Sequence, residues 1–212
     1  MSATAKATVR RRRQRRQAGF SSVTAAARLH LCAVSEESEV RVRHVAALLA
    51  FTPTVRRFGN RMWIRMEHGP TALWLTEALA NKDVTLIEVG GDGGVVEVVN
   101  PQIVLGRYGF REGRWVFGQG LSAAEGISRG AVHAAGTFNG HGLKVACPSA
   151  PMMLTLTAVM SRLGINAKPT DGDPRAAIGA GDVPAALDRL GIAEVADQYR
   201  RLRDTSVMGD RS

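Results

Sequence analysis

The sequence predicts an α+β fold made of two similar halves that meet through paired central helices. The first observation is a repeated order, in which a helix rich in small residues, strands and an outer helix occur twice, about 90 residues apart. The second is that segments 45–50 and 130–136 consist almost entirely of small or apolar residues, which indicates buried helices in close contact. The third is size, because 212 residues with 45% hydrophobic content suffice for one large domain or two small ones.

Apolar periodicity and turn residues predict the elements of the first half. Val23, Ala27 and Leu31 recur at helical spacing, and Pro53 ends the next helix because proline disfavours helix in the residue before it. Gly59-Asn60 fits a hairpin turn, and the glycine-rich turn at 90–94 lacks the Lys-Ser/Thr of a phosphate loop. The expected helices are 21–34, 39–51 and 71–81, and the expected strands are 54–58, 61–67, 85–89 and 95–99.

The second half repeats this order after a segment with mixed signals. Residues 101–121 favour a short helix and then a loop or β-ribbon, and 107–115 mixes arginines with aromatics, so that it could cap the fold, bind a partner or bridge the halves. Gly164 fits a helix C-cap. The expected helices are 122–138, 150–163, 183–190 and 193–203, and the expected strands are 143–147, 165–168 and 175–178.

Most of the net charge of +9 belongs to the N-terminus. Residues 1–20 hold seven cationic side chains and no acid, so residues 21–212 carry only +2. Because a run of like charges without apolar periodicity stays unfolded in isolation, residues 1–20 are expected to be a disordered basic tail. It could neutralise nucleic-acid phosphates, or only keep the protein in solution. The tail residues expected to contact DNA are Arg10, Arg11, Arg12, Arg13, Arg15 and Arg16.

Composition also limits the compartment and the cofactors. Cys32 and Cys147 have no metal-ligand or disulfide-scaffold spacing and are interpreted as buried reduced thiols, which fits a cytoplasmic protein. No run of about 18 apolar residues indicates a membrane span, and the residues after the basic start are too polar for a signal peptide. We therefore expect no membrane partner, no metal and no cofactor.

Five segments in a fixed order resemble the LAGLIDADG architecture, and within it the WhiA family of bacterial transcription regulators. Residues 129–137 resemble the second central helix of that family, 143–148 the following strand, and RLGINAK at 162–168 the next helix-to-strand junction. Residues 186–191 resemble a later helix, and 45–51 match the first central helix more weakly. The resemblance covers roughly residues 40–205 and implies two pseudo-symmetric halves with paired central helices, whose antiparallel sheets form a saddle.

This resemblance sets the expected domain boundaries. They are a basic tail at 1–20, an N-terminal helix at 21–36, a first LAGLIDADG-like half at 37–104, a connecting segment at 105–121, a second half at 122–205 and a flexible C-terminus at 206–212. The chain departs from the family in its Arg-rich tail, and it has no room for the C-terminal helix-turn-helix that WhiA proteins carry.

The resemblance also says where a nuclease would keep its catalytic acids. Active LAGLIDADG endonucleases place one acid at the end of each central helix, where the pair holds divalent metal at the scissile phosphates. The corresponding positions are taken as Thr52 and Asn139, neither of which is a carboxylate, so we expect no nuclease activity. His133, among alanines, is interpreted as a core residue, and no nucleophilic triad is evident around His141, Cys147 and Ser149.

Basic residues on the predicted strands are the remaining candidates for DNA contact. Arginine on an exposed sheet can contact phosphates or read guanine edges, although such residues can equally form an ordinary solvated face. The candidates are Arg56, Arg57, Arg61, Trp63 and Arg65 in the first half, and Lys144, Lys168 and Arg175 in the second.

These observations favour a non-catalytic, WhiA-like transcription regulator that binds DNA or a DNA-bound transcription partner. The resemblance implies a nucleoid-associated role in sporulation and cell division. One alternative is a protein-interaction module that binds a WhiB-like protein, full-length WhiA or an RNA polymerase sigma factor. A second alternative is a degenerate homing endonuclease.

Overall fold

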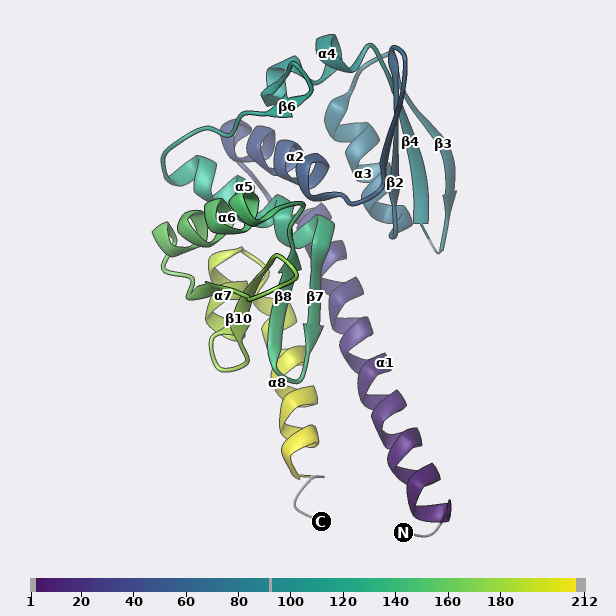
Figure 1. Cartoon of the computed structure of the whole chain (residues 1–212), viewed down its shortest axis with the longest axis vertical. Helices are drawn as coiled ribbons and strands as arrows, with labels where there is room; N and C mark the ends of the chain where they lie inside the picture. The colour runs from purple at the N-terminus through teal and green to yellow at the C-terminus, as the bar shows by residue number, and fades with distance from the viewer. Residues whose placement is uncertain (1–2, 92, 209–212) are drawn as a thin grey trace.

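The structure is a computed structural model that describes the backbone of residues 3–91 and 93–208, with side chains in these ranges except at 3–13, 15–16 and 206–208. Figure 1 shows two α/β halves stacked end to end, with one long helix running from their junction along the second half and beyond it. None of the described helices is long and apolar enough to span a membrane.

The first half consists of a central helix, two hairpins and an outer helix. Its elements are α2 (Ser38–Phe51), β1 (Val55–Phe58), β2 (Arg61–Met66), α3 (Gly69–Leu79), β3 (Val84–Gly90) and β4 (Gly93–Val99). The strands form an antiparallel sheet in the order β1-β2-β4-β3. In β2, buried Met62, Ile64 and Met66 alternate with exposed residues, so one face of the sheet packs on α2 and α3 and the other stays open.

The second half repeats this arrangement. Its elements are α5 (Leu121–Ala135), β7 (Gly136–Asn139), β8 (Gly142–Ala146), α6 (Ala150–Arg162), β9 (Ala167–Pro169), β10 (Arg175–Gly179), α7 (Val183–Arg189) and α8 (Ala193–Met208). The strand order β7-β8-β10-β9 is the same as in the first half when each strand is replaced by its counterpart. This shared topology confirms the two-half α+β fold that the sequence predicts.

A connecting segment covers the first half. It contains α4 (Pro101–Val104), a 3₁₀ turn η1 (Gly106–Tyr108) and a small ribbon of β5 (Phe110–Arg111) and β6 (Arg114–Trp115). The Tyr108 hydroxyl donates to the Ala78 carbonyl at 2.9 Å, and Phe110 is buried in the first-half core. The mixture of short helix and ribbon is therefore as predicted, and its aromatic residues anchor it to one half.

The central helices α2 and α5 approach each other closely at two glycines of α5. A Cβ added to Gly126 would lie 2.3 Å from the Val40 carbonyl oxygen, and one added to Gly130 would lie 2.3 Å from the His44 carbonyl oxygen. The predicted close seam is present, and Ala47 lies in it. Ala135, which the sequence also assigned to the seam, is only partly buried and packs on the second-half core.

The second half begins its sheet earlier than the periodicity predicts. The helix expected to run to residue 138 ends at Ala135, and 136–139 form strand β7, which the sequence analysis missed. Gly136 has extended angles (φ −72°, ψ 134°), while Thr137 and Phe138 pair with Lys144 and Leu143 of β8. Pairing with β8 therefore outweighs the local helical pattern.

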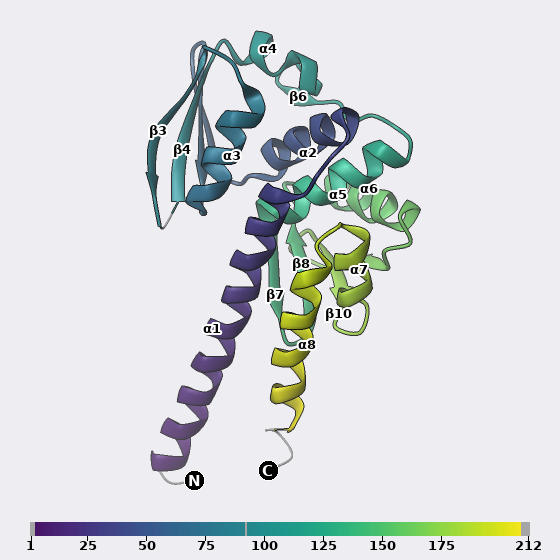
Figure 2. The same cartoon turned by 180° about the vertical axis from the view of Figure 1, so that it is seen from behind.

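Helix α1 (Ala3–Ala33) corrects the prediction of a disordered tail at 1–20. Arginine, alanine, glutamine and lysine are good helix formers, and a helix that is already anchored extends without a new nucleation step. The anchored part packs on the second half, where Phe20 meets Tyr199 and the backbone N–H of Phe138 donates to Thr24 Oγ1 at 3.1 Å. Figures 1 and 2 both show the N-terminal part of α1 projecting away from the body beside α8.

This packing protects one edge of the second sheet. β7 is an edge strand, and exposed edge strands are sites of unwanted pairing with other chains. Because α1 lies along β7 and accepts one of its outward N–H groups, that edge is covered. The part of α1 around Phe20 and Thr24 is thereby held on the flank of the second half, and the basic segment projects beyond it.

Candidate nucleic-acid interface

The open face of the first sheet carries most of the predicted DNA-binding residues. Arg61, Trp63 and Arg65 occupy every second position of β2 and therefore share one face. Arg56 pairs with Trp63 in register, so its side chain lies on this face too. Arg57 pairs with buried Met62 and lies on the opposite face, where its guanidinium stacks 4.8 Å from the Phe110 ring centroid. The structure therefore does not group Arg57 with the other candidates of the first half, because alternation along β1 directs it to the connecting segment.

Two carboxylates, Glu88 and Glu97, lie on this face, and Glu97 neutralises part of its charge. Glu97 Oε1 accepts from Trp63 Nε1 at 2.8 Å and from Arg61 Nη1 at 3.1 Å. The hydrogen bond from Trp63, followed by the hydrogen bond and charge of Arg61, lowers the pKa of Glu97. Among the described residues, neither Arg56 nor Arg65 has a carboxylate within 4.0 Å, so these two cations remain available to an anionic partner.

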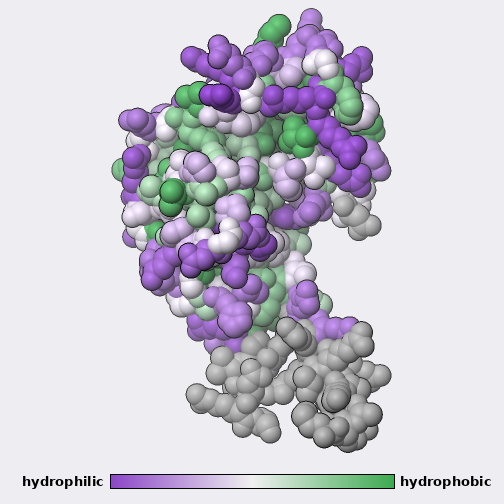
Figure 3. Space-filling view, in the orientation of Figure 1, coloured by the Kyte–Doolittle hydropathy of each residue, from purple (hydrophilic) through white to green (hydrophobic). Residues whose placement is uncertain are grey.

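Apolar side chains lie between the charges on the first sheet. Phe58, Trp63 and Ile87 are 54%, 42% and 52% exposed. In the space-filling view, strongly hydrophilic residues alternate with apolar ones over the first sheet (Figure 3). This mixture suits contacts with stacked bases and sugars as well as phosphates, and it also suits a protein surface.

The open face of the second sheet is less charged. Lys144 pairs with Ala177 and Thr137, and Ala177 pairs with Lys168, so both lysines face the same way. Arg175 pairs with Ala146 on this face, but its Nη2 lies 2.6 Å from Asp173 Oδ2. The structure thus brings together the three basic residues predicted here, although one is already paired.

The predicted arginines of the N-terminus lie in α1, but the side chains of Arg10, Arg11, Arg12, Arg13, Arg15 and Arg16 are outside the described residues. Their backbone belongs to the projecting part of the helix. We therefore keep DNA contact by these residues as a prediction.

The ends of the central helices correct one of the two degenerate catalytic positions. Thr52 is the C-cap of α2, is 7% exposed, and donates its hydroxyl to the Leu48 carbonyl at 2.7 Å. The matching C-cap of α5 is Gly136, whereas Asn139 lies at the far end of β7. The misassignment of Asn139 follows from the overlong helix predicted for 122–138. Segments 48–55 and 132–139 contain no Asp or Glu.

A buried polar chain crosses the seam, and the sequence analysis did not detect it. His44 Nε2 and His133 Nδ1 are 3.0 Å apart, and His44 Nδ1 lies 2.8 Å from Glu36 Oε1. Arg129 Nη1 also reaches Glu36 Oε1 at 3.2 Å, and Thr71 Oγ1 lies 2.9 Å from His133 Nε2. One histidine on each central helix was the available signal, but only the packing of α2 on α5 brings them together.

Burial determines the protonation of this hydrogen-bonded cluster of His44, His133 and Glu36. Desolvation lowers the pKa of both His44 and His133, and for His133 the nearby charges of His44 and Arg28 lower it further. Burial alone would raise the pKa of Glu36, but hydrogen bonding to His44 and the charges of His44 and Arg129 lower it. The cluster therefore holds neutral imidazoles around one ion pair at neutral pH. It links structural elements of both halves and shows no opening to a substrate.

The described His, Cys, Asp and Glu side chains were the candidates for a metal site. No group of three or more His, Cys, Asp or Glu side chains with metal-binding geometry occurs within the part of the chain that the structure describes. Cys32, which we predicted to be buried, is only partly so, and Cys147 is buried.

Comparison with known proteins shows the fold. No family model and no curated protein matches the chain. The N-terminal LAGLIDADG domain of DUF199/WhiA matches with a TM-score of 0.59 and 11% identity over 79% of this chain and 89% of that domain. Full-length DUF199/WhiA from Thermatoga maritima matches with a TM-score of 0.62 and 11% identity, covering 89% of this chain and 66% of that protein.

An endonuclease shares the same architecture. I-DmoI, a homing endonuclease solved in complex with DNA and Mn, matches with a TM-score of 0.53 and 12% identity over 73% of this chain and 97% of its own. The chain therefore has a WhiA-like LAGLIDADG fold, as its sequence predicts. At these identities the likeness establishes the fold alone.

Proposed function

We propose that the protein binds double-stranded DNA across the open faces of its two sheets and does not cleave it. The observation that carries this proposal is the placement of Arg56 and Arg65 on the open first sheet without carboxylate partners among the described residues. Unpaired arginines on a rigid sheet can contact backbone phosphates and guanine edges.

Two further observations support DNA as the ligand. Lys144 and Lys168 extend the basic surface onto the second sheet, and α1 carries six arginines in residues 10–16. The fold is also that of I-DmoI, whose structure was solved with its DNA target. A surface that neutralises several phosphates gains affinity by releasing counterions, so the interaction should weaken steeply with salt.

The residues at the central-helix ends support the proposed absence of cleavage. Thr52 and Gly136 close α2 and α5, and neither can ligate a divalent cation through a carboxylate. A protein with this fold that holds DNA without cutting it is suited to regulating transcription in the manner of WhiA. In that role it would act in the nucleoid, alone or with a DNA-bound transcription partner.

A gel-shift salt titration with matched variants tests DNA binding. Arg65→Gln and Arg56→Gln should each reduce the slope of log affinity against log salt by up to about 0.9, the value of one lost phosphate contact. Arg57→Gln, on the opposite face, is the control and should leave the slope unchanged. Binding that ignores salt, or equal effects of all three variants, would contradict the proposal.

Incubation with plasmid and Mg²⁺ tests the absence of cleavage. The plasmid should remain supercoiled. Metal-dependent nicking would instead favour a degenerate homing endonuclease.

A second candidate function is docking of a protein partner on the first sheet. The exposed apolar residues of this face favour it, with Phe58 54% and Ile87 52% exposed. Such a partner would be a WhiB-like protein, a full-length WhiA or a sigma factor. Ile87→Lys separates the two functions, because an added cation should preserve or strengthen DNA binding while it disrupts an apolar protein contact, measured by pull-down with purified sigma factor.

A further inference from the structure

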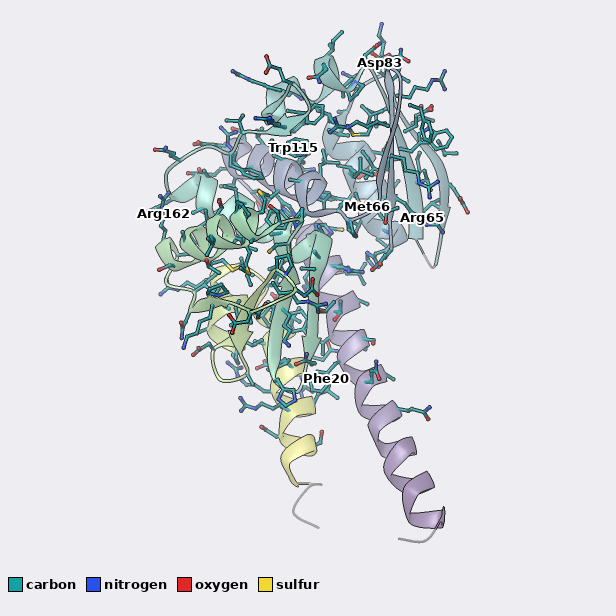
Figure 4. All side chains as sticks on the ribbon, viewed as in Figure 1. Phe20, Arg65, Met66, Asp83, Trp115 and Arg162 are labelled. Atoms are coloured by element: carbon teal, nitrogen blue, oxygen red, sulfur yellow. The ribbon has the colours of Figure 1, made fainter. Side chains whose placement is uncertain are left out.

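A cavity of about 940 Å³ opens between the two halves, beside the anchored part of α1. Its walls come from α1, from the end of β2 and the residues after it, and from the turn of the β7–β8 hairpin. The polar residues that the inference uses are Arg28, Glu67, His68, Asn139 and His141. Phe20 lies at its base between α1 and the second half (Figure 4).

Arg28 is a mostly buried cation with incomplete compensation. Its side chain is 12% exposed, and its Nε is buried without a hydrogen-bond partner among the described residues. The nearest carboxylate oxygen, Glu67 Oε2, lies 3.7 Å from Nη2, which is an ion-pair distance but too long for a hydrogen bond. Because the Glu67 side chain is 78% exposed, it can move away at little cost.

Two neighbours offer further donors to the same space. His68 Nδ1 is 2.9 Å from Thr71 Oγ1, which orients the ring and leaves Nε2 without a described partner. His68 and Arg28 line the same cavity, and burial, followed by the charge of Arg28, lowers the pKa of His68. Asn139 uses its Oδ1 to accept from the His141 backbone N–H at 2.8 Å, so its Nδ2 donor remains for a ligand.

We propose that this cavity binds one phosphate-type oxyanion, with Arg28 as its principal ligand and His68 and Asn139 as supporting donors. A tetrahedral anion would accept from the terminal Nη donors of Arg28 and would displace the loosely held Glu67. Arginine is suited to this task because its planar guanidinium presents several N–H donors to one anion.

Two sources of the phosphate are consistent with this chemistry. One is a DNA backbone phosphate, in which case the inference rests on the proposed function. The other is free inorganic phosphate or the phosphate of a small molecule. The position of the cavity favours a polyanion, because its outer end is lined by Gln17, which directly follows the arginine-rich residues 10–16 of α1.

The free-anion experiment uses inorganic phosphate as the probe. Sodium phosphate, titrated against sodium chloride at equal ionic strength, should shift the imidazole NMR resonances of His68 saturably and raise its pKa, because an adjacent anion favours the imidazolium. Arg28→Gln should abolish the response. Arg162→Gln makes the same charge change at a residue that does not line the cavity, so it should retain the response. Arg162 lies on the opposite side of the molecule from Arg65 (Figure 4).

The DNA experiment compares the same two variants by gel shift. If the phosphate belongs to DNA, Arg28→Gln should lower the log–log salt slope by about 0.9 while Arg162→Gln leaves it unchanged. Arg28→Lys, which keeps the charge, should regain part of the salt slope that Arg28→Gln loses. A partial recovery would show that the loss comes from the charge at this position and not from unfolding.

The two experiments together distinguish the site from the source of its anion. A saturable His68 response or the slope change supports the site, and the experiment that responds identifies the source. A chain that does not bind DNA but responds to phosphate would overturn the proposed function and leave the anion site standing. No response to phosphate, together with equal salt slopes for Arg28→Gln and Arg162→Gln, would overturn the inference.

Discussion

Gly130→Ala is the most direct perturbation of the seam between the halves. The added Cβ would lie 2.3 Å from the His44 carbonyl oxygen and 2.7 Å from both Ala47 Cβ and Leu48 N. Ordinary contact begins at 3.4 Å, so the nearest atom is about 1.1 Å too close. Two of these three neighbours are backbone atoms that cannot rotate away, and α2 and α5 must therefore move apart.

The expected cost follows from that separation. Overpacking a core typically destabilises by about 1–3 kcal/mol, and a gap of about 1 Å forfeits up to half of each van der Waals contact along the seam. We take about 3 kcal/mol as the loss, offset by about 1 kcal/mol because alanine is the better helix former. The net loss of about 2 kcal/mol corresponds to a fall in Tm of about 4–8 °C for a chain of this size.

Gly19→Ala is the matched control in the same assay. It is also a helical glycine, but its Cβ would meet the end of the flexible Leu202 side chain at 2.9 Å rather than backbone. Calorimetric melting should therefore show this variant unchanged or slightly more stable. If Gly130→Ala melts at or above the wild-type temperature, the close-seam argument is wrong. Ala47→Leu should behave as Gly130→Ala does.

Three further predictions concern the buried polar cluster around His133 and Glu36 and the N-terminal helix. The pKa of His133 is lowered in the folded state, so the unfolded chain binds one more proton at acid pH. The free energy of unfolding should therefore fall as the pH drops below about 6.5, by about 1.4 kcal/mol per pH unit. Urea unfolding should show a shallower pH slope for His133→Gln, and equal slopes would refute this. Glu36→Ala strips Arg129 and His44 of a buried partner and should cost about 3 kcal/mol, against less than about 0.5 for exposed Glu37→Ala, by the same measurement. Deleting residues 2–17 should keep the fold but flatten the salt dependence of DNA binding by up to about 6 slope units, and an unchanged slope would show that these arginines do not touch phosphates.

The fold was accessible from the sequence because its main signals are local. The alternation in β2, the turn at Gly59-Asn60 and the small residues of both central helices each predict an element without knowledge of the rest. Their repetition then gives the two-half topology.

The errors arose where tertiary contacts decide the outcome. Strand β7 exists because Thr137 and Phe138 find partners in β8, although their local sequence continues a helical pattern. The same overextension placed Asn139 at a helix end, where the structure has Gly136.

The candidate site was only partly predictable for a related reason. Strand alternation correctly grouped Arg61 and Arg65, but the face of Arg57 depends on its pairing with Met62. The link between His44 and His133 joins residues 89 positions apart, and no sequence pattern in a single chain encodes that distance.

Helix α1 has a consequence for how a duplex would lie on the protein. The two sheets share a strand order, so their backbones alone would give a duplex bound as proposed no preferred direction. A single helix cannot obey that twofold symmetry, and α1 lies along β7 on the second half only. If the protein binds a duplex as proposed, the arginine-rich sequence of α1 would add positive charge on the side of the second half only, and the two directions of the duplex would differ in energy before any base is contacted.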